Sequence, residues 1–364
     1  MSKKFVFVIV ILLGAVLLSA CAGGPVHGST WPGLAADGGG TAYLADGPFV
    51  YAVNLSDGRE TWRYPGQDDR DNGYAFYSPP ALTPDGLVIV GSAGTDYSLV
   101  ALDSNRINNN APAEAWTFTG ARDHWRAAPL VFEDKLFAVN SDGNLYVLNL
   151  QDGRTLKEVR LDGRLWSQPI TDGERVYITS LDHLIIALDA DTYEILWQED
   201  VGGAVPGSAV LGEDGALYVG SLASKLEKFD PATGNHETVI EAENWVWGTP
   251  SLDSDTLYFS DVDGNFYSVG TTTGNLNWTV KPDGPVTASP LLLDEYVFLA
   301  TESGSVYAMD RDGKVLWTEE VGGKIYTTPV AADDLILVAP LETEFYLAAL
   351  DRDGRQVWTF TPGE

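Results

Sequence analysis

Short apolar runs separated by turn residues fill the chain from about residue 31 to residue 362. Residues 286–317 show the pattern clearly, because VTASPLLL, YVFLAT, SVYAMD and KVLWTEE are separated by polar residues at 294–295, 302–304 and 311–313. Runs rich in β-branched and aromatic residues, bounded by Asp-Gly or Ser-Gly, predict β-strands joined by tight turns. No stretch after residue 20 has a sustained helical period, so the pattern predicts an all-β protein.

A twelve-residue phrase recurs along the chain, as VYAMDRDGKVLW at 306–317 and LAALDRDGRQVW at 347–358, with looser copies elsewhere. The residue that follows its apolar run is an Asp or Asn in seven units and a Gly in one, at intervals of 40 to 49 residues: Asn54, Asp103, Asn149, Asp189, Asp230, Gly270, Asp310 and Asp351. Four strands in each unit of about 40 residues are typical of a β-propeller blade. The sequence therefore predicts an eight-bladed propeller of four-stranded antiparallel blades over residues 31–364.

The phrase ends in Trp in six of the eight units, and Lys157 and Thr238 stand at this position in the third and fifth units. A Trp that recurs around the whole ring is expected to pack between neighbouring blades rather than to bind a ligand. The first unit starts near Trp31 with its own first strand, and the last unit ends with its outer strand. We therefore expect the ring to close by packing, without a strand exchanged between its ends.

The first 20 residues have the features of a secretory signal peptide. Lys3 and Lys4 precede an apolar run at 5–18 that is short for a membrane span. Leu-Ser-Ala-Cys at 18–21 resembles the bacterial lipobox, in which the Cys becomes the lipidated first residue of the mature chain. We thus expect a signal peptide at 1–20, lipidation of Cys21, a flexible tether at 21–30 and a single propeller domain at 31–364.

The chain is strongly acidic, with 22 Lys and Arg against 52 Asp and Glu and a formal charge of −30. This charge argues against binding to nucleic acid or to anionic lipid headgroups by electrostatic attraction. Cys21 is the single cysteine, so no disulfide can form within the chain. The acidity itself fits either a salty habitat or a basic partner surface.

The repeat A-[LMV]-[DN]-x-x-x-G-x-x-x-W, together with the pairs that open the units, resembles the PQQ-type propeller repeat. The opening pairs are Ser78-Pro79, Ala128-Pro129, Gln168-Pro169, Thr249-Pro250, Ser289-Pro290 and Thr328-Pro329. One branch of this family, the quinoprotein dehydrogenases, holds pyrroloquinoline quinone and Ca²⁺ at the ring centre, commonly beside a pair of adjacent cysteines. The other branch comprises non-enzymatic lipoproteins similar to BamB, which take part in outer-membrane protein assembly. Length, blade count, the lipobox and the lack of the cysteine pair favour the BamB-like branch.

The residues just before the opening pairs are expected near one mouth of the central channel. Aromatic residues cluster there, with charged neighbours in one loop, and the set that we expect to contact a partner or ligand is Phe76, Tyr77, Arg122, His124, Trp125, Arg126, Trp166, Trp245, Trp247 and Tyr326. The alternative is that these aromatic side chains only pack against adjacent blades. The loops at 66–74, 104–114 and 121–126 are not repeated, and the insert at 104–114 is either a recognition loop or a spacer.

The sequence favours an extracytoplasmic, lipid-anchored, monomeric scaffold that binds proteins of the cell envelope in outer-membrane protein assembly and catalyses no reaction. It would lie on the periplasmic face of the outer membrane or, in a host with one membrane, on the cell surface. The alternatives are a lipoprotein that binds a small ligand or glycan at the aromatic mouth and, less favoured, a quinone-dependent dehydrogenase. No cofactor, metal site or nucleic-acid partner is expected. Asp261–Asn265 looks like a Ca²⁺ loop, but Thr272 stands where the twelfth-position Glu would be required.

Overall fold

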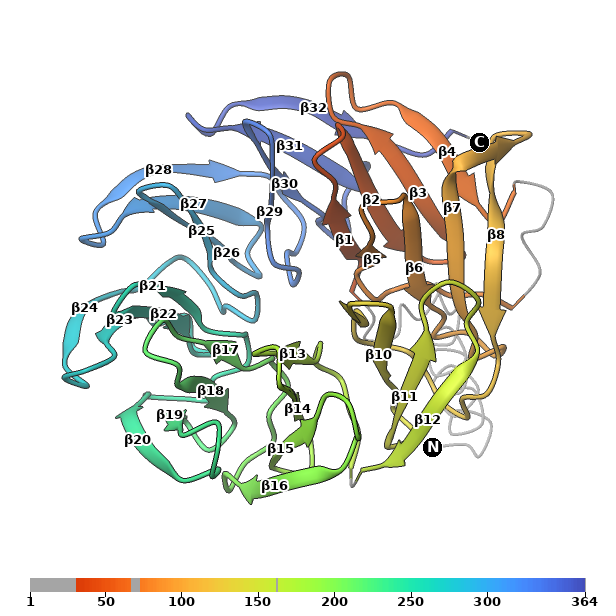
Figure 1. Ribbon diagram of the computed structural model, residues 1–364. Coiled ribbons are helices and arrows are strands. Elements are labelled where there is room, and N and C mark those ends of the chain that lie inside the picture. The colour runs from red at the N-terminus through yellow and green to blue at the C-terminus, as the bar shows by residue number, and fades with distance from the viewer. Residues whose placement is uncertain (1–30, 67–72, 162, 364) are drawn as a thin grey trace, which may run out of the picture. The chain divides into compact units, whose positions relative to one another are not determined.

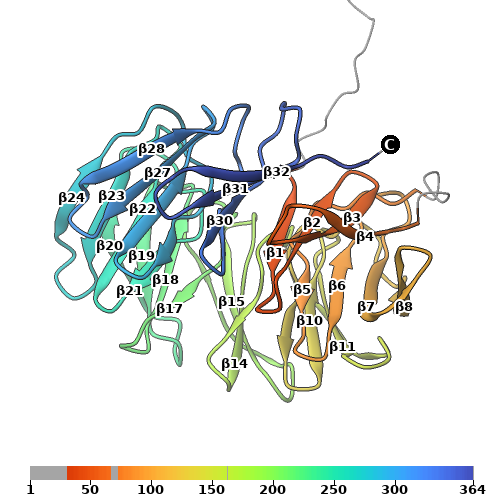
Figure 2. The same ribbon diagram turned by 90° about the horizontal axis from the view of Figure 1, so that it is seen from above.

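The computed structural model describes residues 31–66, 73–161 and 163–363. The signal peptide, Cys21 and tether predicted at residues 1–30, and most of the loop at 66–74, lie outside the described residues. Within the described part, the chain forms eight sheets of four antiparallel strands, and each sheet uses four strands that are consecutive in sequence. The sheets are arranged in sequence order around a ring, as Figure 1 shows, and Figure 2 shows the same ring from the side. The predicted eight-bladed propeller is confirmed.

Each blade runs from a short inner strand to a longer outer strand. The first four blades contain β1 (Gly33–Ala36), β2 (Thr41–Asp46), β3 (Phe49–Asn54) and β4 (Glu60–Tyr64); β5 (Ala81–Leu82), β6 (Leu87–Gly91), β7 (Leu99–Asn108) and β8 (Ala111–Phe118); β9 (Leu130–Phe132), β10 (Lys135–Val139), β11 (Asn144–Asn149) and β12 (Thr155–Arg160); and β13 (Ile170–Thr171), β14 (Arg175–Thr179), β15 (Leu184–Asp189) and β16 (Ile195–Asp200). The last four contain β17 (Val210–Leu211), β18 (Leu217–Ser221), β19 (Lys225–Phe229) and β20 (His236–Glu241); β21 (Ser251–Asp253), β22 (Thr256–Ser260), β23 (Phe266–Gly270) and β24 (Leu276–Val280); β25 (Leu291–Leu293), β26 (Tyr296–Ala300), β27 (Ser305–Asp310) and β28 (Val315–Glu320); and β29 (Val330–Ala332), β30 (Leu335–Val338), β31 (Leu347–Asp351) and β32 (Gln356–Phe360).

The core consists of eight apolar clusters, and each one fills the space between two neighbouring blades. Successive residues of a strand point to opposite faces, so each middle strand supplies side chains to both of its neighbours. This is why β6 and β30 are almost continuously apolar and buried. The outer strands alternate more, because each lies at the edge of its sheet; β16, for example, buries Trp197 between exposed residues. None of the described residues forms a helix long and apolar enough to cross a membrane.

In five of the eight blades, the recurring Trp joins its blade to the turn of the next one. Trp317 donates its indole N–H to the carbonyl oxygen of Arg352 at 2.8 Å. A Cβ added to Gly354, in the same turn, would lie 2.7 Å from the Trp317 ring, so the ring lies flat against that glycine. We call this arrangement the tryptophan latch, and it recurs for Trp116 with Leu150, Trp197 with Pro231, Trp278 with Arg311 and Trp358 with Leu55. The prediction that this Trp packs between blades is confirmed.

The ring closes by the same contact. Trp358 of the last blade donates to Leu55 of the first blade at 2.8 Å, across 303 positions of sequence. An apolar cluster shared by blades 1 and 8 surrounds this bond, and Arg63 of β4 donates to the carbonyl oxygen of Gly363 at 3.0 Å. Among the strands of the described residues, none is exchanged between the ends, as expected.

Small polar side chains at the opening pairs connect the inner ends of blades 5 to 8. The backbone N–H of Ser208 donates to Thr249 Oγ1 at 2.8 Å, that of Thr249 to Ser289 Oγ at 2.9 Å, and that of Ser289 to Thr328 Oγ1 at 3.1 Å. The hydroxyl before each proline thus satisfies a backbone donor of the preceding blade that no strand partner could reach. The opening pairs are therefore structural.

The insert at 104–114 extends the hairpin of β7 and β8. Its tip residues Asn109 and Asn110 have φ values of 49° and 62°, which asparagine tolerates in tight hairpin turns. Asn110 accepts a hydrogen bond from the backbone N–H of Arg63 at 3.2 Å, and Glu114 accepts one from the Tyr64 hydroxyl at 2.6 Å. The hairpin therefore covers the outer strand of blade 1, while Ile107 on it stays 41% exposed.

A candidate binding face around the ring axis

The segments that lead into the inner strands alternate between two environments. One residue of each segment is at most 1% exposed and packs between blades, namely Phe76, Trp125, Leu165, Val205, Val246, Val286 and Ile325. The residue after it is partly exposed, namely Tyr77, Arg126, Trp166, Pro206, Trp247, Thr287 and Tyr326. Extended backbone has a period of two, so neighbouring side chains must point in opposite directions. Only the second set is available to a partner.

Phe76 and Trp125 are therefore corrected from mouth residues to core residues. The Phe76 ring lies 5.3 Å from that of Tyr74 in the core between blades 1 and 2. Trp125 packs against Tyr146 at 5.7 Å and donates its indole N–H to the carbonyl oxygen of Tyr97 at 2.8 Å. Both belong to the set of residues that point into the core between blades, where their rings are packed and the Trp125 N–H has a hydrogen-bond partner.

Three aromatic side chains from different blades meet near the axis. The Trp31 ring stacks on Tyr326, with centroids 5.1 Å apart and planes 6° apart, and it lies 5.9 Å from Trp247. These residues precede the inner strands of blades 1, 8 and 6. Blade 7 stands between blades 6 and 8, so Trp31 can contact side chains from both of these blades only close to the ring centre. We call Trp31, Trp247 and Tyr326 the axial aromatic cluster. The sequence predicted two of its members and missed Trp31, which lies before a weakly marked strand.

A charged contact joins the neighbouring segments of blades 3 and 4. The Arg126 guanidinium lies 5.0 Å from the centre of the Trp166 ring, at a distance that allows a cation–π interaction. Burial lowers the pKa of Arg126, and the nearby positive charge of Arg164 lowers it further, while Asp123 acts in the opposite direction. No described carboxylate lies within ion-pair distance of Arg126, so this guanidinium keeps its hydrogen-bond donors for solvent or a partner.

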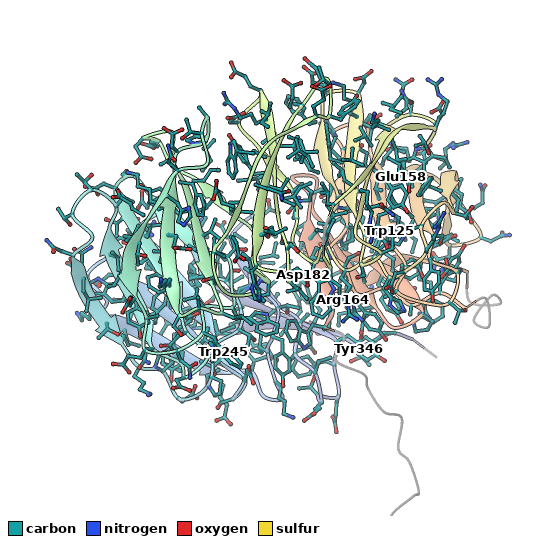
Figure 3. The ribbon with its side chains drawn as sticks, turned by 90° about the horizontal axis from the view of Figure 1, so that it is seen from below. Trp125, Glu158, Arg164, Asp182, Trp245 and Tyr346 are labelled. Carbon is teal, nitrogen blue, oxygen red and sulfur yellow. The ribbon has the colours of Figure 1, made fainter. Side chains whose placement is uncertain are left out.

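The segments that lead into the inner strands all lie on one face of the ring, which we call the loop face. The remaining predicted residues lie on this face but do not join either group. Arg122 is exposed, and His124 is held by Asp123, whose Oδ1 lies 2.8 Å from its Nδ1. Tyr77 is partly exposed and Trp245 is 51% exposed. In the side view of Figure 3, Trp245 lies at the lower side of the molecule and Arg164 lies above it. Among residues 31–66, 73–161 and 163–363, no ring contact or hydrogen bond connects these four predicted side chains to the other predicted ones.

The fold family raises the question of whether the centre could hold a planar quinone. A stacking platform would need an open aromatic face near the axis, yet Trp31 already covers the ring of Tyr326. The loop that resembles a Ca²⁺ site is a turn, in which the buried Asp261 carboxylate accepts hydrogen bonds from the backbone N–H groups of Asp263 and Asn265 and from the Tyr267 hydroxyl. The axial residues described here do not fit the quinone.

Comparisons with known proteins agree on one family. The model of the family described as outer membrane protein assembly factor BamB matches residues 105–312 and 287–364. The assembly factor BamB of Shewanella oneidensis is 27% identical over 243 residues, which are 60% of this chain and 59% of that protein. The chain thus matches a little over half of the length of this relative.

Two solved structures share the fold. The crystal structure of BamB from Moraxella catarrhalis superposes with a TM-score of 0.69 at 19% identity, over 88% of this chain and 93% of that one. A computationally designed protein, Ika8, superposes with a TM-score of 0.72 at 14% identity, over 92% of this chain and 97% of its own. Likeness to a designed ring shows that fold alone assigns no role, so the family match over residues 105–364 is the more informative result. On that match, the chain belongs to the family of outer membrane protein assembly factor BamB.

Proposed function

We propose that this protein is a lipid-anchored scaffold that binds other proteins of the cell envelope during outer-membrane protein assembly. The observation that carries the proposal is the match of the family model to residues 105–364, since the family is described as an assembly factor. A scaffold needs a surface that differs from the repeat, and the loop face supplies one. In this proposal Cys21 carries the lipid, the ring is a monomer on the periplasmic side of the outer membrane, and it catalyses no reaction.

The loop at 122–126 is the proposed partner contact. Its exposed Arg122 stands out in a chain with a formal charge of −30, as does Arg126, which has no ion-pair partner among the described residues and lies over the Trp166 ring. Arginine and tryptophan are the residues that most often dominate binding energy at protein interfaces. A ligand that binds inside the aromatic mouth is less well supported, because Trp31 occupies the stacking surface there.

Site-specific photocrosslinking in cells tests this proposal. A photoreactive amino acid at position 122 is expected to crosslink to the machinery that inserts outer-membrane barrels. The same group at Glu133, an exposed turn residue on the opposite face, is the matched control and should give no such product. Deletion of the gene should lower the level of barrel proteins in the outer membrane, and Arg122→Glu with Arg126→Glu should restore it less well than the natural sequence. Unchanged barrel levels after deletion, or a host with a single membrane, would contradict the assembly role.

A further inference from the structure

Blade 3 and the segment that leads into blade 4 differ in charge from the rest of the ring. Residues 121–164 contain seven Lys and Arg against seven Asp and Glu, whereas the whole chain has 22 against 52. Arg122 and Arg126 lie in the segment that leads into blade 3, and Arg164 lies in the segment that leads into blade 4. An anionic partner therefore meets less repulsion here than over the ring as a whole.

Two carboxylates of this region are held by other groups. Asp123 Oδ1 accepts a hydrogen bond from the backbone N–H of His124 at 2.7 Å and lies 2.8 Å from the Nδ1 atom of the same residue. Asp142 accepts hydrogen bonds from the backbone N–H of Arg122 at 3.0 Å and from the Tyr146 hydroxyl at 2.7 Å. Within the described ranges, no carboxylate forms an ion pair with the guanidinium group of any of the three arginines.

The contact between Arg126 and Trp166 has hydrogen-bond donors without acceptors. The Arg126 guanidinium lies over the Trp166 ring, 5.0 Å from its centre. A guanidinium in this position still has N–H donors along its edge, and two of them can bind one carboxylate in parallel. The Nε1 atom of Trp166 is buried and has no hydrogen-bond partner among the described residues. Burial lowers the pKa of Arg126, and the positive charge of Arg164 acts in the same direction, so two like charges lie close together.

An anion bound at this contact would relieve the repulsion between the two arginines and supply the missing acceptors. We infer that the pair formed by Arg126 and Trp166 is where the protein partner places a carboxylate side chain, so that an acidic segment of the partner binds the loop at 122–126. The inference rests on the proposed function for the identity of the partner as a protein. An anionic membrane fits less well, because its extended surface would meet the −30 charge of the chain, whereas one acidic side chain meets only this region.

An NMR titration with a short peptide tests the carboxylate site directly. The protein is labelled with ¹⁵N in its eleven tryptophans, and Trp166→Phe identifies the indole signal of Trp166. The probe is acetylated and amidated triglutamate, and the matched triglutamine peptide is its control. We expect the Trp166 signal to shift progressively with triglutamate and at least fivefold less with triglutamine. Arg126→Gln should reduce the triglutamate shift at least fivefold.

The matched variant is Arg355→Gln, which removes the same charge from an exposed turn on the opposite face and should leave the shift unchanged. A melting curve checks that Arg126→Gln is folded. If it is not, Arg126→Lys replaces it and should reduce the shift at least twofold, because lysine lacks the planar pair of donors. An unchanged shift in the Arg126 variant would overturn the inference. A larger shift with inorganic phosphate at equal concentration would overturn the assignment to a carboxylate. Asp162 lies outside the described residues, and a stronger triglutamate shift in Asp162→Asn would show that the chain fills the site itself.

The crosslink from position 122 tests the partner side in cells. Arg126→Glu should lower its yield at least fivefold, and mass spectrometry of the product locates the crosslinked segment of the partner. Exchange of one acidic residue of that segment for Arg should then restore at least half of the natural yield. Failure of every such exchange would overturn the inference. Absence of any crosslink in the natural sequence would contradict the proposed function, while the peptide titration would still decide whether the carboxylate site exists.

Discussion

The joint between the last and first blades differs from the joint between blades 3 and 4 at one matched pair of positions. At the closing joint, Trp358 bonds to the turn of blade 1 and lies against Gly58, where an added Cβ would be 2.7 Å from its ring. Between blades 3 and 4, Lys157 replaces the Trp and Tyr193 replaces the turn glycine, with φ still at 63°. The glycine of the repeat is therefore required for two separate reasons, its positive φ and the indole ring above it.

The joint between blades 4 and 5 departs from the repeat in another way. Glu227 pairs across β18 and β19 with Val219, so it shares the face of blade 5 that packs on blade 4. Its side chain is 5% exposed, its Oε2 has no hydrogen-bond partner among the described residues, and His236 Nε2 lies 3.9 Å from its Oε1. Burial raises the pKa of Glu227, against the opposing effects of His236 and Lys225. A buried carboxyl without full hydrogen bonding costs stability, and here it lies in a joint that the latch of Trp197 also holds.

Breaking the closing latch should have the largest effect. Trp358→Ala removes a buried ring, leaves a cavity and deprives the Leu55 carbonyl of its donor, so we expect the free energy of unfolding to fall by about 3–5 kcal/mol. Urea denaturation followed by circular dichroism measures this loss. Lys157→Ala, at the matched position of blade 3, should change the free energy by no more than about 0.5 kcal/mol. Similar losses for both variants would show that the latch does not hold the ring closed.

The steric part of the glycine requirement can be isolated at two turns. Gly354→Ala should cost about 3 kcal/mol, because its φ is 84° and its Cβ would lie 2.7 Å from the Trp317 ring. Gly173→Ala has a similar φ of 95° but nothing within 4 Å of the new Cβ, so it should cost only about 1–2 kcal/mol. Thermal melting of both variants gives the comparison. Equal losses of stability in the two variants would show that the positive φ alone, and not the Trp ring, requires glycine at this position.

Removing the buried charge of blade 5 should stabilise the protein. The pKa of Glu227 is raised in the folded state, so its contribution is favourable below the ordinary glutamate pKa of about 4.3 and is lost as the pH rises through the folded-state pKa. Glu227→Gln should therefore match the natural sequence near pH 4 and exceed it by about 1 kcal/mol at pH 8. Urea denaturation at several pH values measures the difference. A constant difference across this range would mean that the pKa of Glu227 is the same in the folded and unfolded states.

The repeat made the blades predictable, whereas the site was only partly so. Strand boundaries, turns and the packing of the recurring Trp follow from local periodicity, which is repeated in each unit. The sequence could not show which of Phe76 and Tyr77 is buried. An alternation of buried and exposed residues does not say which residue of a pair is the buried one until the neighbouring blade is known. Trp31 was missed because the residues around it carry no repeat signal. Glu227 was missed because a polar residue in a strand shows burial only through its tertiary surroundings.

The smallest effect is expected between blades 3 and 4, where the Trp and the turn glycine of the repeat are both replaced. Tyr193→Gly relieves the strain of a positive φ, worth about 1 kcal/mol, and loses the edge contact of the Tyr193 ring with Phe137 at 6.1 Å, worth about the same. The two terms should cancel to within about 0.5 kcal/mol in urea denaturation. The double variant Lys157→Trp with Tyr193→Gly rebuilds both halves of the latch and should be more stable than either single variant. If the two changes are merely additive, the Trp and the turn glycine do not act as a unit.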